Sequence, residues 1–298
     1  IRDYYASRGL GDVYKRQMLM NIFQSFLVTA ELPHYGLIIT IASGVVNVIL
    51  DALFVAVFKF GVIGAAVATG ISQAIGGFIP LFIFIFSKKS KLHLGRTHFS
   101  KKALLKSCAN GSSEFMSNVA VSLVNMLYNW QLMKLLGHNG VTSYGVIMYV
   151  NYIFLSIFFG YSIGSSPVVG YHYGAGNTDE LKGLFKKSIR IILVSSVVLT
   201  LTAELLAAPL SKIFVSYDKD LLKATTHAFA IYSASFLIAG INIYASSFFT
   251  ALNDGLTSAI ISFFRTLVFQ VIAVIVLPLI FGSQGIWFAI IAAEALSL

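Results

Sequence analysis

Charge is scarce in this sequence. Of its 298 residues, 11% are charged and 12 are acidic, whereas soluble domains carry about a quarter charged residues. Between Asp51 and Asp179 the chain holds a single acidic residue, Glu114. A chain with 57% hydrophobic residues and a mean hydropathy of +0.82 cannot cover a water-facing surface with polar groups. The composition therefore excludes an ordinary soluble domain and predicts a membrane protein.

The residues that define several functional classes are also missing. The single cysteine, Cys108, excludes an internal disulfide framework, and the six histidines show no metal-ligand spacing. No nucleophile–base pair and no pair of carboxylates lies within the apolar runs. We therefore expect no enzyme, no metal centre and no cofactor. The net charge of +9 comes from basic residues clustered between apolar runs, which favours anionic lipid headgroups over nucleic acid as partners.

Long apolar runs dominate what is present. A helix needs about 20 residues to cross a hydrocarbon core of about 30 Å. Seven runs reach this length, at residues 35–58, 61–87, 112–136, 141–168, 186–209, 224–251 and 257–281. Two partial runs flank them, at 18–30 and 284–298. Short connections such as GHNG and FGSQG predict antiparallel neighbours, so the expected fold class is an all-α polytopic membrane protein.

Basic residues set the expected orientation and domain limits. Segments 88–106 and 182–190 together hold 11 Lys and Arg residues, and two spans separate them, so both are assigned to the cytoplasmic side. We predict a first lobe at 18–87, a basic linker at 88–106 and a second lobe at 107–298. Residues 1–17 have neither an apolar period nor the order of a signal peptide, and we exclude them as a spurious or disordered leader.

An internal repeat refines this architecture. The turn FGxxG at 60–64 falls on the FGxxG turn at 281–285 when the chain is shifted against itself by 221 residues. At this offset the helix that begins near Ser112 has its counterpart about 110 residues upstream of Ile1. The repeat therefore predicts two six-helix lobes related by a pseudo-twofold axis along the membrane normal. The N-terminal lobe is expected to be incomplete, lacking roughly three helices.

Three segments resemble one known family. Residues 47–73 read NVILDALFVAVFKFGVIGAAVATGISQ and resemble the fifth and sixth helices of the multidrug and toxic compound extrusion (MATE) family. Residues 164–188, GSSPVVGYHYGAGNTDELKGLFKKS, resemble the end of its eighth helix and the following cytoplasmic turn. Residues 264–297, FRTLVFQVIAVIVLPLIFGSQGIWFAIIAAEALS, resemble its last two helices.

The resemblance implies a function. It implies two lobes around a V-shaped cavity and an antiporter that exports amphipathic or cationic organic compounds in exchange for H⁺ or Na⁺. It further implies a multi-pass monomer in the bacterial cytoplasmic membrane, with small organic substrates and lipids as partners. The first helix of the family, which usually carries an aspartate central to coupling, has no counterpart in this sequence. The alternative is a lipid-linked substrate flippase of the same superfamily, which needs a broader and more cationic cavity.

The run 112–136 carries a polar stripe. Spacings of 4, 4, 3 and 4 place five polar residues on one helical face: Glu114, Asn118, Ser122, Asn125 and Asn129. Such a stripe in a membrane helix faces protein or water rather than lipid. Two interpretations of Glu114 stay open. It is either a first-turn acid that complements the dipole of a helix starting near Ser112, or a carboxylate for coupling or substrate contact.

Asn47 and Asp51 form a second polar face, four residues apart in NVILD. They are either a polar lock between helices or contributors to an ion site. Arg265 lies inside the run 257–281, where it either snorkels to the interface or pairs with an acid in the cavity. Asp254 and Glu294 are the acids that could be its partner.

Two further features bear on transport. Gly164 and Pro167 predict a helix kink suited to a rocking transporter, although packing alone also explains them. Seven aromatic residues are candidates to line a cavity and hold organic cations, against the commoner role of aromatic side chains in packing. They are Tyr128, Trp130, Tyr144, Tyr149, Tyr152, Tyr232 and Tyr244.

Overall fold

The computed structural model describes residues 2–86, 92, 95 and 99–298, with side chains from Lys15 onward except those of Ser113 and Glu114. The chain divides into two compact units, Ile1–Phe99 and Ser100–Leu298, and each is described by itself. The boundary between them falls inside the predicted linker 88–106, part of which lies outside the described residues. The predicted domain limits stay predictions.

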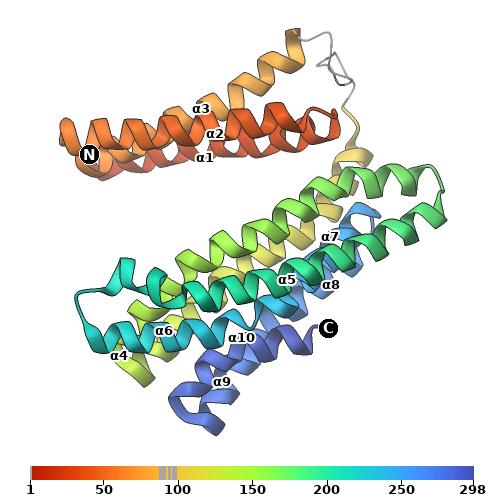
Figure 1. The fold of residues 1–298 in the computed structure, drawn as a ribbon. Helices are drawn as coiled ribbons and strands as arrows, with labels where there is room; N and C mark the ends of the chain where they lie inside the picture. Colours follow the sequence, from red (N-terminus) through yellow and green to blue (C-terminus); the bar gives the residue numbers. More distant parts are fainter. Residues whose placement is uncertain (1, 87–91, 93–94, 96–98) are drawn as a thin grey trace. The chain divides into compact units, whose positions relative to one another are not determined.

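The first unit is a layer of three helices (Figure 1). They are α1 (Arg2–Thr29), α2 (Pro33–Asp51), which continues as the π-helical segment η1 (Ala52–Val57), and α3 (Gly61–Phe86). Both α1 and α2 pack on α3. The α1–α3 contact includes Phe23 stacked on Phe84, with ring centroids 5.7 Å apart. Because α1 begins at Arg2, it joins the 1–17 segment to the predicted partial run 18–30 without a break.

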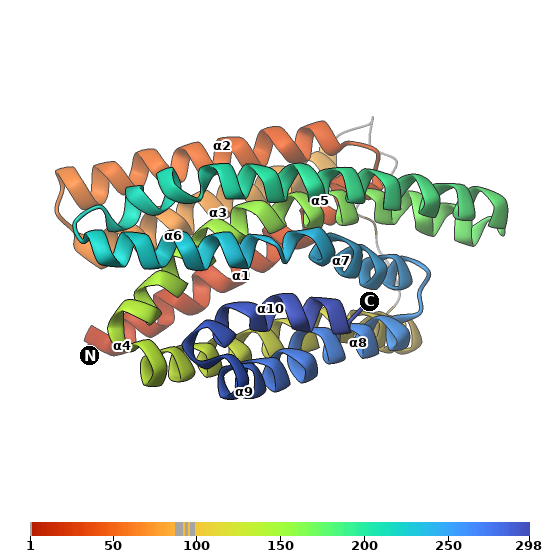
Figure 2. The same cartoon turned by 60° about the horizontal axis from the view of Figure 1, so that its bottom comes forward.

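The second unit is a larger helical bundle (Figures 1 and 2). It consists of α4 (Lys101–Gly174), α5 (Thr178–Val215), α6 (Lys219–Ser233), α7 (Phe236–Ala251), α8 (Gly255–Phe263), the π-helical η2 (Phe264–Val268), α9 (Phe269–Phe281), the 3₁₀ turn η3 (Gly282–Gln284) and α10 (Gly285–Leu296). Helix α4 is two helices that meet at Gly137, where φ is 65° and ψ is −154°. Residues 2–86 and 99–298 contain no strand, so the all-α prediction is confirmed.

The apolar runs become helices long enough to cross a membrane. Within residues 2–86 and 99–298, five helical stretches have the length and composition of a span, and a sixth is added when α6 and α7 count as one. The count is lower than the seven predicted runs because α4 contains two of them, 112–136 and 141–168, while the stretch Gly255–Leu296 joins the run 257–281 to the partial run 284–298. The predicted run 224–251 is divided between α6 and α7. It bends by 48° between α6 and α7.

One glycine turn organises the helix pairs. It has the form GxxG and occurs at 61–64, 137–140 and 282–285, where its first glycine has φ of 57°, 65° and 61° in turn. Such positive φ values suit glycine because it lacks a Cβ. The second glycine is buried each time. At Gly285 a Cβ would lie 2.2 Å from the carbonyl oxygen of Leu277, so the helices are too close there for any side chain.

The turn supports the internal repeat in the structure. The two copies predicted from the 221-residue offset share both the positive φ and the buried second glycine. The third copy, at 137–140, was not predicted as part of the repeat. Its surroundings are similar, because a Cβ on Gly140 would lie 3.4 Å from the carbonyl oxygen of Leu132 on the preceding helix.

We predict that Gly285→Ala destabilises the second unit. The added methyl group meets backbone atoms of Leu277 that cannot rotate away, and such overpacking costs about 1–3 kcal/mol. The measurement is the midpoint of thermal unfolding of the purified protein in detergent. The matched control is Gly145→Ala in α4, where nothing lies within 4 Å of the new Cβ. Equal midpoints for the two variants would contradict the prediction.

Candidate functional site

The predicted polar stripe lies on the first half of α4. The Ser122 hydroxyl donates to the Asn118 carbonyl oxygen at 3.1 Å, and Asn129 Nδ2 donates to the Asn125 carbonyl oxygen at 2.9 Å. Asn125 is the half-buried member, and its Oδ1 accepts a 2.7 Å hydrogen bond from the Tyr144 hydroxyl. Asn118, Ser122 and Asn129 are exposed. The stripe is thus tied through Asn125 to the second half of α4, while three of its members are accessible.

Glu114 belongs to α4, but its side chain lies outside the described residues. The start of helix α4 nevertheless shows whether Glu114 lies in the first turn. Helix α4 begins at Lys101, with Ser100 as its N-cap, and the Ser100 hydroxyl accepts from the Ala103 N–H at 3.3 Å. Glu114 is therefore several turns into the helix. The interpretation of Glu114 as a first-turn acid is wrong, and its assignment to coupling or substrate contact stays a prediction.

Asn47 and Asp51 lie one turn apart on α2, and Asp51 is the last residue before the π-helical segment η1. Both side chains are half-buried. Asp51 Oδ1 and Asn47 Nδ2 are buried atoms that have no hydrogen-bond partner among the described residues. The stripe on α4 belongs to the other unit, so these two groups of residues are not brought together within one described body.

The second unit contains a buried ion pair. Arg265, in η2, donates through Nε to both Glu294 carboxylate oxygens, at 3.1 and 2.9 Å, and through Nη2 to Oε1 at 2.8 Å. Glu294, in α10, is 3% exposed and Arg265 is 12% exposed. Asn242, in α7, donates through Nδ2 to Glu294 Oε2 at 2.7 Å and to the Glu294 carbonyl oxygen at 2.9 Å. These three residues form one fully bonded group, which we call the Arg265 triad.

The triad decides between the two interpretations of Arg265. The snorkelling interpretation is wrong, because the Arg265 side chain is only 12% exposed and is paired with Glu294, the acid of α10. Asp254 has another role. Its carboxylate accepts from the Thr257 N–H at 3.1 Å and from the Thr257 hydroxyl at 2.7 Å, which caps helix α8. Sequence reasoning missed Asn242, since a single amide in the apolar run 224–251 gives no sign of what it contacts.

The aromatic candidates separate into two groups. Tyr128, Tyr144, Tyr232 and Tyr244 are buried in the core of the second unit, where Tyr128 stacks on Tyr144 with ring centroids 5.0 Å apart. Trp130, Tyr149 and Tyr152 are exposed. The Lys134 ammonium already lies over the Trp130 ring, 5.5 Å from its centroid. The exposed group can therefore meet a ligand, whereas the buried group packs the core.

The helix that carries Gly164 and Pro167 is α4, and it continues past both residues to Gly174. A Cβ built on Gly160 or Gly164 meets no atom of the described residues within 4 Å. Close helix approach at these glycines is therefore not seen within the unit. The kink assigned to Gly164 and Pro167 stays a prediction.

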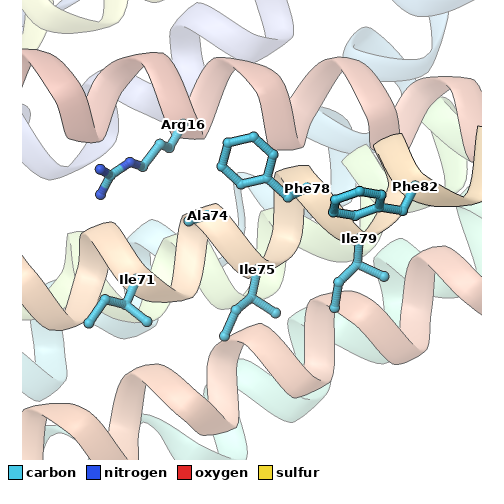
Figure 3. A pocket seen from close by; sticks show the side chains of 7 residues that line it. All are labelled: Arg16, Ile71, Ala74, Ile75, Phe78, Ile79 and Phe82. Atoms are coloured by element: carbon cyan, nitrogen blue, oxygen red, sulfur yellow. The ribbon is translucent and has the colours of Figure 1, made fainter. Parts of the chain in front are cut away.

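An open pocket of about 430 Å³ lies on the first unit (Figure 3). Figure 3 shows its lining, which consists of Arg16 from α1 and of apolar side chains from α3: Ile71, Ala74, Ile75, Phe78, Ile79 and Phe82. An open apolar surface of this kind is expected on a helix that faces lipid. The charged group of the lining, Arg16, comes from residues 1–17, whose assignment as a leader stays a prediction. None of the lining residues belongs to the polar stripe or to the face of Asn47 and Asp51.

The helix pairs, the recurring glycine turn and the polar groups inside apolar spans define a multi-pass membrane protein of the helical-bundle class. The MatE family model matches residues 115–276, which is more than half of the chain. The chain belongs to the MatE family, the multidrug and toxic compound extrusion transporters. The predicted family resemblance is confirmed.

Relatives and solved structures agree with this assignment. The chain is 25% identical over 284 residues to the multidrug export protein MepA of Staphylococcus haemolyticus (strain JCSC1435), covering 93% of this chain and 61% of that protein. It is 23% identical over 282 residues to MepA of Staphylococcus aureus (strain MSSA476), covering 94% of this chain and 61% of that protein. The chain thus spans less than two thirds of the length of these relatives.

The fold is also that of solved MATE structures. An outward-facing multidrug resistance MATE family transporter of the MOP superfamily superposes with a TM-score of 0.87 at 20% identity, covering 93% of this chain and 63% of that chain. A MATE crystal structure in complex with MaL6 gives a TM-score of 0.88 at 19% identity, covering 94% and 63%. At these identities the likeness shows the fold alone.

We predict that the Asp254 cap is insensitive to pH in the physiological range. Hydrogen bonds from the Thr257 hydroxyl and from the Thr257 N–H hold the pKa of Asp254 below its usual 3.8. A depressed pKa contributes stability that is present above the usual value and is lost as the pH falls through the folded-state value. The Asp254→Asn variant keeps an N-cap side chain but cannot titrate.

The measurement is the difference between the thermal midpoints of wild type and Asp254→Asn as a function of pH. The difference should stay constant from pH 8 to pH 5. Below about pH 4 it should shift in favour of the variant, because only the wild type loses a charged cap. A shift that develops between pH 7 and pH 5 would show that Asp254 titrates in the range of a proton-coupling group.

Proposed function

We propose that the full-length protein is a cation-coupled antiporter that exports amphipathic or cationic organic compounds by alternating access. Membership of the MatE family supports export, and the MepA relatives are named as multidrug export proteins. H⁺ or Na⁺ is the coupling ion. The protein works as a monomer in the bacterial cytoplasmic membrane, a location that its Staphylococcus relatives and its 11 basic residues on one side support.

The observation that carries this proposal is the buried, unpartnered carboxylate oxygen of Asp51. A carboxylate inside a membrane span is costly, and a buried oxygen without a partner adds to that cost. Asp51 Oδ1 is such an oxygen, at the junction between α2 and η1. Binding a proton or a hard cation such as Na⁺ removes the unsatisfied charge. The Asn47 amide on the same face supplies a carbonyl oxygen as a further ligand.

The substrate class follows from charge and aromatic exposure. Trp130, Tyr149 and Tyr152 are exposed, and aromatic rings attract organic cations. The Lys134 ammonium lies over the Trp130 ring and Phe214 stacks on Tyr149, so Tyr152 is the best placed of the three for such a contact.

A flippase for lipid-linked anions needs a cationic cavity instead. The second unit has two guanidinium groups. Arg190 is exposed near the start of α5, and Glu294 neutralises Arg265 at 2.8 Å. Export of cationic or neutral amphiphiles is therefore favoured over lipid-linked transport.

We predict that Asp51→Asn abolishes cation-coupled export and leaves folding intact. The amide is nearly the same size as the carboxylate but carries no charge, so it neither binds the coupling ion nor raises the cost of burial. The measurement is ethidium efflux from cells that express the full-length protein, driven by an imposed H⁺ or Na⁺ gradient. Expression level and thermal midpoint are recorded in parallel.

The control is Glu204→Gln, which removes an exposed acid of α5 and should leave efflux unchanged. Coupled efflux at the wild-type rate in Asp51→Asn would contradict the assignment of Asp51. Lipid transfer by the wild-type protein without ethidium export would overturn the proposed function in favour of the flippase.

A second prediction concerns Glu114. Glu114→Gln in the full-length protein should abolish coupled export and leave the thermal midpoint unchanged, because it removes the charged group of the polar stripe. Loss of coupled export in both Glu114→Gln and Asp51→Asn, the expected result, would mean that each unit contributes a carboxylate that coupling requires. Unchanged efflux in Glu114→Gln would remove the stripe from the coupling mechanism.

A further inference from the structure

The Arg265 triad joins three separate elements of the second unit. Arg265 comes from η2, Glu294 from α10 and Asn242 from α7. Both carboxylate oxygens and the backbone carbonyl of Glu294 accept hydrogen bonds within the triad. We propose that these three residues are positioning residues of the transport cycle, forming a latch that export requires and folding does not. This inference rests on the proposed export function.

The internal repeat shows that the helix-pair architecture does not need a charge at this place. At the offset of 221 residues, Arg265 aligns with Gly44 and Glu294 with Gln73. The corresponding helices α2 and α3 of the first unit pack without an ion pair at these positions. One residue before each of these positions, the Ser43 hydroxyl of α2 donates a hydrogen bond to the Ser72 carbonyl oxygen of α3, at 2.5 Å.

The energetics of buried ion pairs also indicate that the triad is not needed for stability. Moving a carboxylate and a guanidinium out of water costs several kcal/mol each, and their attraction does little more than offset this cost. Replacing such a pair with apolar side chains of similar volume is often neutral or stabilising, whereas removing one partner is strongly destabilising. Stability alone therefore gives no reason for a chain with so few charges to bury this pair.

The location of the triad suggests why the pair is buried: it lies beside two irregular stretches of helix. Arg265 belongs to a π-helical segment, and single π turns inside α-helices are frequent at functional sites. Asn242 belongs to α7, which follows the 48° bend (Figure 2). At this bend the Ala234 N–H donates to the Ile231 carbonyl and the Ser235 N–H to the Tyr232 carbonyl, three residues back instead of four.

The triad thus fixes α7 to the last two helices and leaves the bend at Ala234 and Ser235 as the place where the broken span flexes. Loss of the latch should disturb the movement of α7 with these helices. Substrate binding does not depend on that movement. The expected result is a lower turnover of export at unchanged substrate affinity, which a purely structural role would not produce.

The test uses the double variant Arg265→Met/Glu294→Leu in the full-length protein. Both charges are removed together, and Asn242 keeps its hydrogen bond to the backbone carbonyl of residue 294. We expect a thermal midpoint equal to or above that of wild type and an unchanged Kd for ethidium. The maximal efflux rate should fall clearly below that of wild type.

The charge-swapped variant Arg265→Glu/Glu294→Arg serves as the rescue. It restores the pair with opposite orientation, and the Asn242 amide can turn its oxygen toward the new guanidinium. Efflux should recover relative to the apolar double variant. Arg265→Lys should fall between the two, because lysine keeps the charge but loses the forked hydrogen bonding.

Wild-type efflux in the apolar double variant would overturn the latch while leaving the proposed function in place. A double variant that does not fold would also overturn it, since folding would then require the pair. A wild-type protein without coupled export would overturn the proposed function and the latch together.

Discussion

Every backbone N–H and C=O group in the hydrocarbon must find its partner within the protein, and this constraint shapes the whole structure. It accounts for the continuous helices and for where they are interrupted. Among the interruptions, the π-helical segments and the bend between α6 and α7 keep backbone hydrogen bonds of another spacing. Irregular backbone therefore marks places where local packing or a turn, rather than the need to cross the membrane, determines the conformation.

Much of the fold could be predicted because hydropathy and glycine both act locally. A run of about 20 apolar residues becomes a span by itself, and a glycine at positive φ ends it. The bend between α6 and α7 could not be predicted, because the residues on both sides of Ala234 and Ser235 are as apolar as the rest of the run. A span broken by packing looks, in sequence, like an unbroken one.

The candidate site was predictable only where its residues share one helix. The stripe from Asn118 to Asn129 and the face of Asn47 and Asp51 follow from helical spacing. The pairing of Arg265 with Glu294 crosses 29 residues and a turn, so the sequence could offer Glu294 only as one of two acids. The helix start at Lys101 was missed because Lys101, Lys102 and Lys106 look like the end of a basic linker in sequence, although they belong to α4.

The buried pair has an electrical consequence. A unit charge that crosses the full membrane potential does work of about 2.3 kcal/mol per 100 mV. Arg265 and Glu294 lie 2.8 Å apart and carry opposite charges, so together they have no net charge to move. The membrane potential therefore exerts no net force on the pair as a whole. The triad joins η2, α10 and α7 without adding a net charge that the voltage could act on.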